Sequence, residues 1–79
     1  MLGNIREYIS SNELQITILL DRVNVLNFDR IRNITDKEVS FTKDKRKIKV
    51  IGKNLKINKL LDDEALILGN IMKVELDHE

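Results

Sequence analysis

The sequence predicts a small all-β domain of seven or eight short antiparallel strands, arranged as a sandwich or a barrel. Three observations carry this prediction. Apolar and polar residues alternate with a period of two over most of the chain after residue 13, as they do on strands with one buried face. Polar turn signals recur about every 8 to 12 residues. A pattern of strand, glycine and strand occurs around Gly52 and again around Gly69, with no helix-forming run between.

An N-terminal segment, residues 1–13, precedes the β domain of residues 14–79. Asn4 with Glu7 three residues later resembles a capping box. The apolar residues recur near the helical period and are Leu2, Ile5, Tyr8 and Ile9. We therefore expect a short helix over residues 5–11. Helices below about 12 residues are marginal in water, so its apolar face must pack on something. A lid over one end of the sheet is the favoured interpretation, and a dimerisation or membrane-surface element is the alternative.

The first strands are apolar on both faces. One face carries Leu14, Ile16, Ile18 and Leu20. The other face carries Gln15 and Thr17 together with Leu19, and Leu26 and Phe28 are also assigned to a second apolar face. A 79-residue domain has only one core to receive these side chains. Left exposed together, Leu19, Leu26 and Phe28 would form an apolar patch of a kind that monomers seldom expose. They are the candidate self-association residues of a homodimer or larger assembly, and the N-terminal helix is the alternative cover.

Two polar turns divide the next strands. Residues 27–29 predict a turn or bulge, and residues 35–38 predict a polar turn. In the strand that follows, Val39 and Phe41 face the core, and Ser40 and Thr42 face outward.

The second half of the domain contains the two structural glycines. Residues 43–46 lack glycine, so we expect a longer, mobile loop at this hairpin tip rather than a two-residue turn. Gly52 predicts a bulge, a corner or a positive φ that lets the strand change sheets. Gly69 and Asn70 predict a turn, and the spacing from Ile71 to Val74 predicts an extra residue near Met72.

Composition places the chain in a reducing compartment. The 79 residues include no cysteine, so neither disulfides nor a cysteine-based metal site can supplement the small core. No stretch is long and apolar enough for a transmembrane helix, and the apolar run at residues 14–20 lacks the basic flank of a signal peptide. We expect a cytoplasmic protein stabilised by association between chains.

Catalytic groups are scarce in the sequence. His78 lies between two acids at the end of the chain, where a metal would need further ligands held elsewhere. None of the serines stands in a nucleophile motif with a second histidine as base, and no phosphate-binding glycine pattern occurs. Asp62, Asp63 and Glu64 are interpreted as a solvated turn rather than a cation site. We expect a non-enzyme with no catalytic residues, cofactor, metal or small-molecule substrate.

Charge is distributed unevenly along the chain. Residues 43–59 hold eight basic residues and one acid, whereas residues 60–79 hold one basic residue and six acids. The basic block is the candidate interaction surface for nucleic acid or an anionic membrane and comprises Lys43, Lys45, Arg46, Lys47, Lys49, Lys53, Lys56 and Lys59. It lacks the interleaved aromatic residues of single-strand binders. Neutralisation by cross-strand pairing with the acidic segment is the favoured interpretation.

The glycine-centred half resembles the YabP/YqfC family of sporulation proteins. The residues that carry the resemblance are Ile48, Val50, Gly52, Leu55 and Ile57 and, beyond the acidic turn at residues 62–64, Leu66, Leu68, Gly69, Ile71 and Val74. The resemblance extends over residues 14–76. It implies a small immunoglobulin-like β-sandwich without catalytic residues, with a structural or assembly role in the mother cell of endospore-forming bacteria. The role would concern the spore coat or the forespore envelope.

Two classes of function follow from the sequence. The favoured class is a non-enzymatic sporulation protein, cytoplasmic in the mother cell, at the forespore membrane if its partner is a sporulation membrane protein. The alternative is a small basic β-barrel that binds nucleic acid or an anionic membrane surface through residues 43–59. The lysine density of that block departs from the family pattern, and so does the short N-terminal segment.

Overall fold

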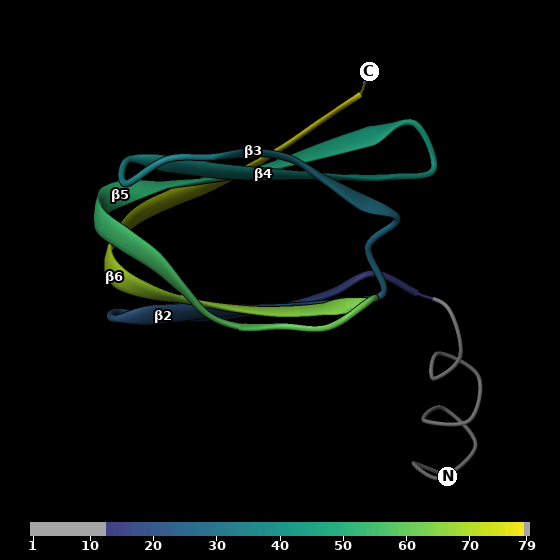
Figure 1. The fold of residues 1–79 in the computed structure, drawn as a ribbon. Helices are drawn as coiled ribbons and strands as arrows, with labels where there is room; N and C mark the ends of the chain where they lie inside the picture. The colour runs from purple at the N-terminus through teal and green to yellow at the C-terminus, as the bar shows by residue number, and fades with distance from the viewer. Residues whose placement is uncertain (1–12, 79) are drawn as a thin grey trace, which may run out of the picture.

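A computed structural model describes residues 13–78 of the chain, so the helix expected over residues 5–11 lies outside the described part (Figure 1). The described residues form six strands: β1 (Gln15–Leu19), β2 (Arg22–Leu26), β3 (Arg30–Ile34), β4 (Glu38–Lys43), β5 (Arg46–Leu60) and β6 (Glu64–His78). All pairings are antiparallel, in one sheet with the order β1-β2-β6-β5-β4-β3. The all-β antiparallel prediction is confirmed.

The expected count of seven or eight strands is wrong for the described residues. β5 and β6 are each 15 residues long and continue through the glycines at which the sequence analysis divided them. Gly69 and Asn70 in particular lie inside β6 rather than in a turn. Glycine is compatible with a sharp bend as well as with a turn, and local sequence does not distinguish the two.

The single sheet folds over into two layers, because β5 and β6 bend and pass from one layer to the other (Figure 1). The first layer contains β3 and β4, and β4 pairs with β5 only over residues 46–51. The second layer contains β1 and β2, and β2 pairs with β6 only over residues 64–68. The two long strands thus hold both layers together, and the core lies between them.

Close backbone contact at the bend explains both glycines. A Cβ atom on Gly52 would overlap the carbonyl oxygen of Asn70. Gly69 has φ +143°, and a Cβ there would lie 2.8 Å from the carbonyl oxygen of Asn54. Asn54 itself has φ +55°, and the β5–β6 register shifts on both sides of Gly52 and Lys53. The first of these shifts leaves Met72 without a partner, which confirms the extra residue predicted there.

The turn between β3 and β4 holds this bend in place. The Gly52 amide donates to the Lys37 carbonyl over 3.0 Å, and the Leu55 amide donates to the Asp36 carbonyl over 2.8 Å. The turn itself is closed by Thr35, whose hydroxyl accepts from the Glu38 amide at 2.9 Å. The polar turn predicted over residues 35–38 is confirmed, and it satisfies backbone groups that the bend leaves free.

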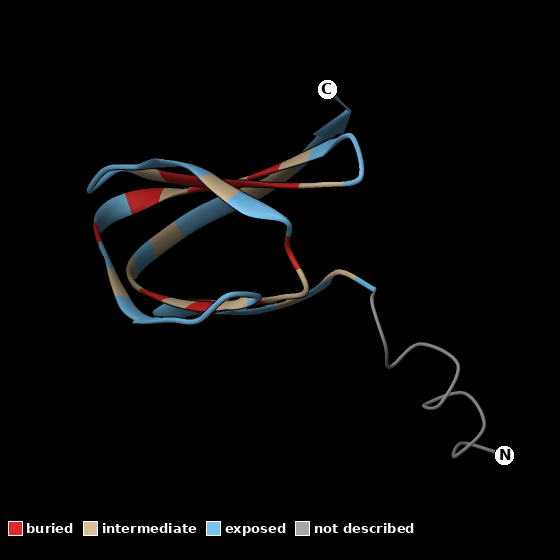
Figure 2. Cartoon of the chain, turned by 45° about the vertical axis from the view of Figure 1, so that its right-hand side comes forward, coloured by how far each residue is buried: buried red, intermediate tan, exposed pale blue. Residues whose placement is uncertain are grey.

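The core formed by residues 13–78 is aliphatic apart from one aromatic pair. Buried positions occur in both layers (Figure 2) and are Val23, Val25, Phe28, Val39, Phe41, Ile48, Val50, Leu55, Ala65 and Ile67. The rings of Phe28 and Phe41 lie 4.8 Å apart at a tilt of 48°. Ser40 and Thr42 are also buried, contrary to their expected outward exposure. The residues opposite them on β3 and β5 have longer side chains. These longer side chains cover the short side chains of Ser40 and Thr42, which lie on a central strand.

The hairpin tip between β4 and β5 also differs from expectation. Lys43 pairs with Arg46, so the connection is a two-residue turn and the predicted longer loop is wrong. Asp44 and Lys45 have φ +48° and +67°, the left-handed conformation of a type I′ turn. The Asp44 amide donates to the Asp29 carboxylate over 3.0 Å. This hydrogen bond to the loop that precedes β3 stabilises the type I′ turn, although the turn contains no glycine.

Candidate functional site

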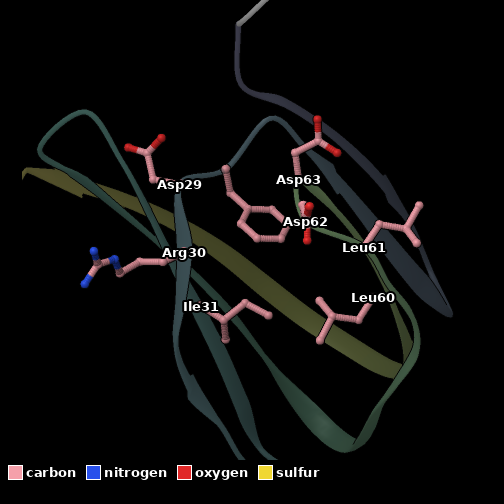
Figure 3. Close-up of a pocket in the computed structure, with 8 residues that line it drawn as sticks. Asp29, Arg30, Ile31, Leu60, Leu61, Asp62 and Asp63 are labelled. Atoms are coloured by element: carbon pink, nitrogen blue, oxygen red, sulfur yellow. The ribbon is translucent and has the colours of Figure 1, made fainter.

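An open groove of about 760 Å³ lies where the start of β3 faces the turn between β5 and β6. It is lined by Phe28, Asp29, Arg30, Ile31, Leu60, Leu61, Asp62 and Asp63. Figure 3 shows Ile31 and Leu60 directed into the groove from opposite sides, while Arg30 points away from it. The groove therefore combines an apolar interior with aspartates on its rim.

The loop that crosses from one layer to the other builds this groove. Asn27 has φ +67°, and its amide donates to the Asp63 carbonyl over 2.6 Å in the β5–β6 turn. Two residues later the Asp29 amide donates to the Thr42 carbonyl of β4 over 2.8 Å. The turn or bulge predicted for residues 27–29 is confirmed, and it brings Phe28 into the core beneath the groove.

Two neighbouring leucines on the groove wall are only half covered. Leu60 is 50% exposed and Leu61 is 52% exposed. Neither leucine was among the predicted site residues, although the sequence contains a signal: two consecutive leucines cannot both face the core of a strand with a period of two. Half-exposed leucines around a hollow are typical of a surface that binds an apolar side chain of a partner.

The three candidate self-association residues do not form one surface. Leu19 is 52% exposed and Leu26 is half-buried, and their pairing with Arg22 and Gln15 places them on the outer face of the second layer. Phe28 is buried against Phe41 instead, so its predicted exposure is wrong. The positive φ of Asn27 interrupts the alternation and turns Phe28 inward.

The basic block is divided between the two layers. Lys47 and Lys49 lie on the first layer, whereas Lys56 and Lys59 lie on the second, beyond the bend at Gly52. The tip of the β4–β5 hairpin carries Lys43, Lys45 and Arg46, and Lys53 lies at the bend opposite Asn70. The strand that continues in sequence is bent in space, so these eight cations do not gather on one face.

Acidic residues of β6 accompany the lysines of the first layer. Lys47 lies directly opposite Asp77, and Lys49 lies opposite Glu75. The Lys73 ammonium is 2.9 Å from the Glu75 carboxylate. This hydrogen bond, with a smaller contribution from Lys49, lowers the pKa of Glu75. In the second layer Lys59 is 3.4 Å from Glu64. The Lys59–Glu64 ion pair is cross-strand, whereas Lys73 and Glu75 lie on the same strand, so neutralisation of the whole basic block stays a prediction.

Within residues 13–78, no group of three or more histidine, cysteine or acidic side chains is placed to hold a metal ion. The same part of the chain contains no helix that could cross a membrane.

Comparison of the chain with protein-family models, with curated proteins and with solved structures finds no match.

Proposed function

We propose that this chain is a non-enzymatic assembly protein that acts through protein contacts. The groove between β3 and the β5–β6 turn carries this proposal, because Leu60 and Leu61 stand half exposed on its wall. We further propose that it works in sporulation, in the mother cell, at the spore coat or the forespore envelope. This step rests on the resemblance to the YabP/YqfC proteins, and so does the immunoglobulin-like relationship of the fold.

The bend gives the residues of that resemblance a common physical role. The Cδ2 atom of Leu55 lies 3.0 Å from the Cβ position of Gly52 and 2.9 Å from that of Gly69. The glycine, the leucine three residues later and the distant second glycine therefore meet at one point. A sequence that repeats this spacing would form the same bend, which supports the resemblance as one of fold.

A genetic experiment tests the proposed function. Deletion of the gene from its endospore-forming host should lower the yield of resistant spores, and wild-type protein should restore it. Leu60→Lys should fail to restore it, because Leu60 is directed into the groove and the lysine places a charge there. Leu20→Lys is the matched control, since Leu20 is 90% exposed on the β1–β2 hairpin. A deletion strain that sporulates like the parent contradicts the sporulation role, and full activity of Leu60→Lys contradicts the role of the groove.

A binding experiment addresses the alternative function. Purified protein is titrated with RNA, with duplex DNA and with vesicles of anionic lipid at increasing salt. The division of the basic block between two layers supports weak binding to all three. Micromolar affinity that falls steeply with salt would favour the nucleic-acid or membrane function instead.

A further inference from the structure

The folded sheet has unpaired strand edges within the described residues. β1 and β3 end the strand order. In addition, β4 does not extend along residues 53–60 of β5, so one side of that segment has no neighbouring strand. In the same way, β2 does not extend along residues 72–78 of β6. An unpaired edge exposes backbone donors and acceptors that can pair with another strand.

Three of these four edges are poor templates for pairing. β3 has a register shift between Ile31 and Asn33 and carries two arginines. Residues 53–60 of β5 contain two register shifts and three lysines, and the Leu55 amide is already bonded to the β3–β4 turn. Bulges and lysines are the usual means by which natural sheets block edge pairing. β1 has only five residues and no charge that would specify a register.

The free edge of β6 has fewer of these devices, because residues 72–78 contain one lysine, Lys73, and the only register shift leaves Met72 unpaired at the start of the edge. Its other side pairs with β5 without a shift from Lys73 opposite Ile51 to His78 opposite Arg46. Val74 and Leu76 lie opposite the buried Val50 and Ile48 and so face the core side, yet Leu76 is 54% exposed. Lys73 and Glu75, which flank Val74 in the sequence, lie on the outer face and carry opposite charges.

We propose that this edge pairs with the same edge of a second copy, antiparallel, on a two-fold axis at Val74. Lys73 of each copy then lies opposite Glu75 of the other, and Met72 lies opposite Leu76. A two-fold axis satisfies both charge pairs at once, which is the self-complementarity that a symmetric dimer needs. The half-exposed Leu76 of each copy gains an apolar neighbour across the junction.

The neighbouring residues select this register. An axis at Glu75 would place the two Glu75 side chains opposite each other, and an axis at Leu76 would oppose Glu75 to Asp77. Like charges directly opposite each other are unfavourable. The Ile71 amide donates to the Leu20 carbonyl over 3.3 Å, so the β1–β2 hairpin ends the available edge just before Met72. Residues 72–76 of the two copies fill the space that remains. This proposal does not depend on the function proposed above.

Single cysteines test the register, because the natural chain has none. Residues directly opposite each other in an antiparallel pair have Cα atoms about 4.5 to 5.5 Å apart, within the range of a disulfide. Val74→Cys should therefore form a covalent dimer under diamide. Glu75→Cys and Leu76→Cys should do so much more slowly, because their own copies lie beyond the ~7 Å limit. Equal rates for the three variants would overturn the register.

Charge exchange tests the pairing without a covalent bond. Lys73→Glu and Glu75→Lys should each raise the dimer dissociation constant about five- to twentyfold. The double variant should return to within about threefold of wild type, because the opposite charges are restored. Lys59→Glu is the matched control and should leave association unchanged, since its partner Glu64 lies on the second layer. Circular dichroism confirms folding of each variant.

Two outcomes would overturn the proposal. One is a wild-type mass of a single chain at millimolar concentration. The other is a wild-type dimer that survives both single reversals while Leu26→Glu dissociates it, because the contact would then lie on the outer face of the second layer.

Discussion

At the scale of single residues, the two glycines determine whether the sheet can fold over. Gly52 and Gly69 come from different strands, yet each leaves room for the backbone of the other strand. Gly52→Val should lower the free energy of unfolding by about 1 to 3 kcal/mol, because its Cβ must displace the Asn70 carbonyl. Denaturant unfolding measures the change. Ile51→Val on the adjacent half-buried residue is the control and should cost less. An unchanged midpoint in Gly52→Val would contradict the close approach.

Glu75 gives a residue-scale prediction on pH. Its pKa is lowered chiefly by the hydrogen bond from Lys73, so the folded protein holds this proton less tightly than the unfolded chain does. The resulting stabilisation is complete above the unfolded pKa and is lost as pH falls through the folded pKa. Lys73→Met should raise the pKa of Glu75 toward its ordinary value. Carbon-detected NMR titration of the carboxylate measures this, and an identical titration curve in both proteins would exclude Lys73 as the cause.

At the scale of elements, the β4–β5 hairpin depends on a turn that its sequence does not favour. Lys45 has φ +67°, which costs a residue with a Cβ about 1 to 2 kcal/mol, whereas glycine adopts this conformation freely. Lys45→Gly should therefore raise the free energy of unfolding by up to about 1 kcal/mol after the entropy of glycine is subtracted. Thermal unfolding measures it. Lys53→Gly, at an exposed residue without positive φ, should destabilise instead.

The mobility predicted for the hairpin tip rested on the absence of a tight turn, and the structure removes that reason. The Asp44 amide donates to Asp29, and Lys43 lies 3.8 Å from the same carboxylate. Asp29→Ala should accelerate hydrogen exchange at the Asp44 amide while the β5 amides next to the core remain slow. Rapid hydrogen exchange at the Asp44 amide of the wild type would instead support the prediction that the hairpin tip is mobile.

At the scale of the whole molecule, association remains the expected supplement to a small core, in which ten apolar residues of the described range 13–78 are buried. Light scattering at micromolar concentration should give twice the 9.2 kDa chain mass. The sequence pointed to Leu26 as the contact, but burial of Phe28 reduces that patch, and the free edge of β6 is the more regular surface. We therefore expect the dissociation constant of the dimer to stay unchanged in Leu26→Glu and to rise in Glu75→Lys.

The sequence by itself determined the all-β class, most strand positions and the turns at residues 27–29 and 35–38. These features depend on the alternation of side chains and on turn chemistry, which act between neighbours in the chain. The unpaired Met72 was predictable for the same reason, since an inserted residue disturbs the period of two.

Only the tertiary structure decided whether a glycine bends a strand or ends it, because the answer lies in the facing carbonyls of Asn70 and Asn54. It also decided that a continuous basic block is divided between two layers and that Phe28 is buried rather than exposed. The groove at Leu60 and Leu61 depends on β3, which is distant in sequence. Each of these properties arises from contacts between residues far apart in the chain, and no local pattern records such contacts.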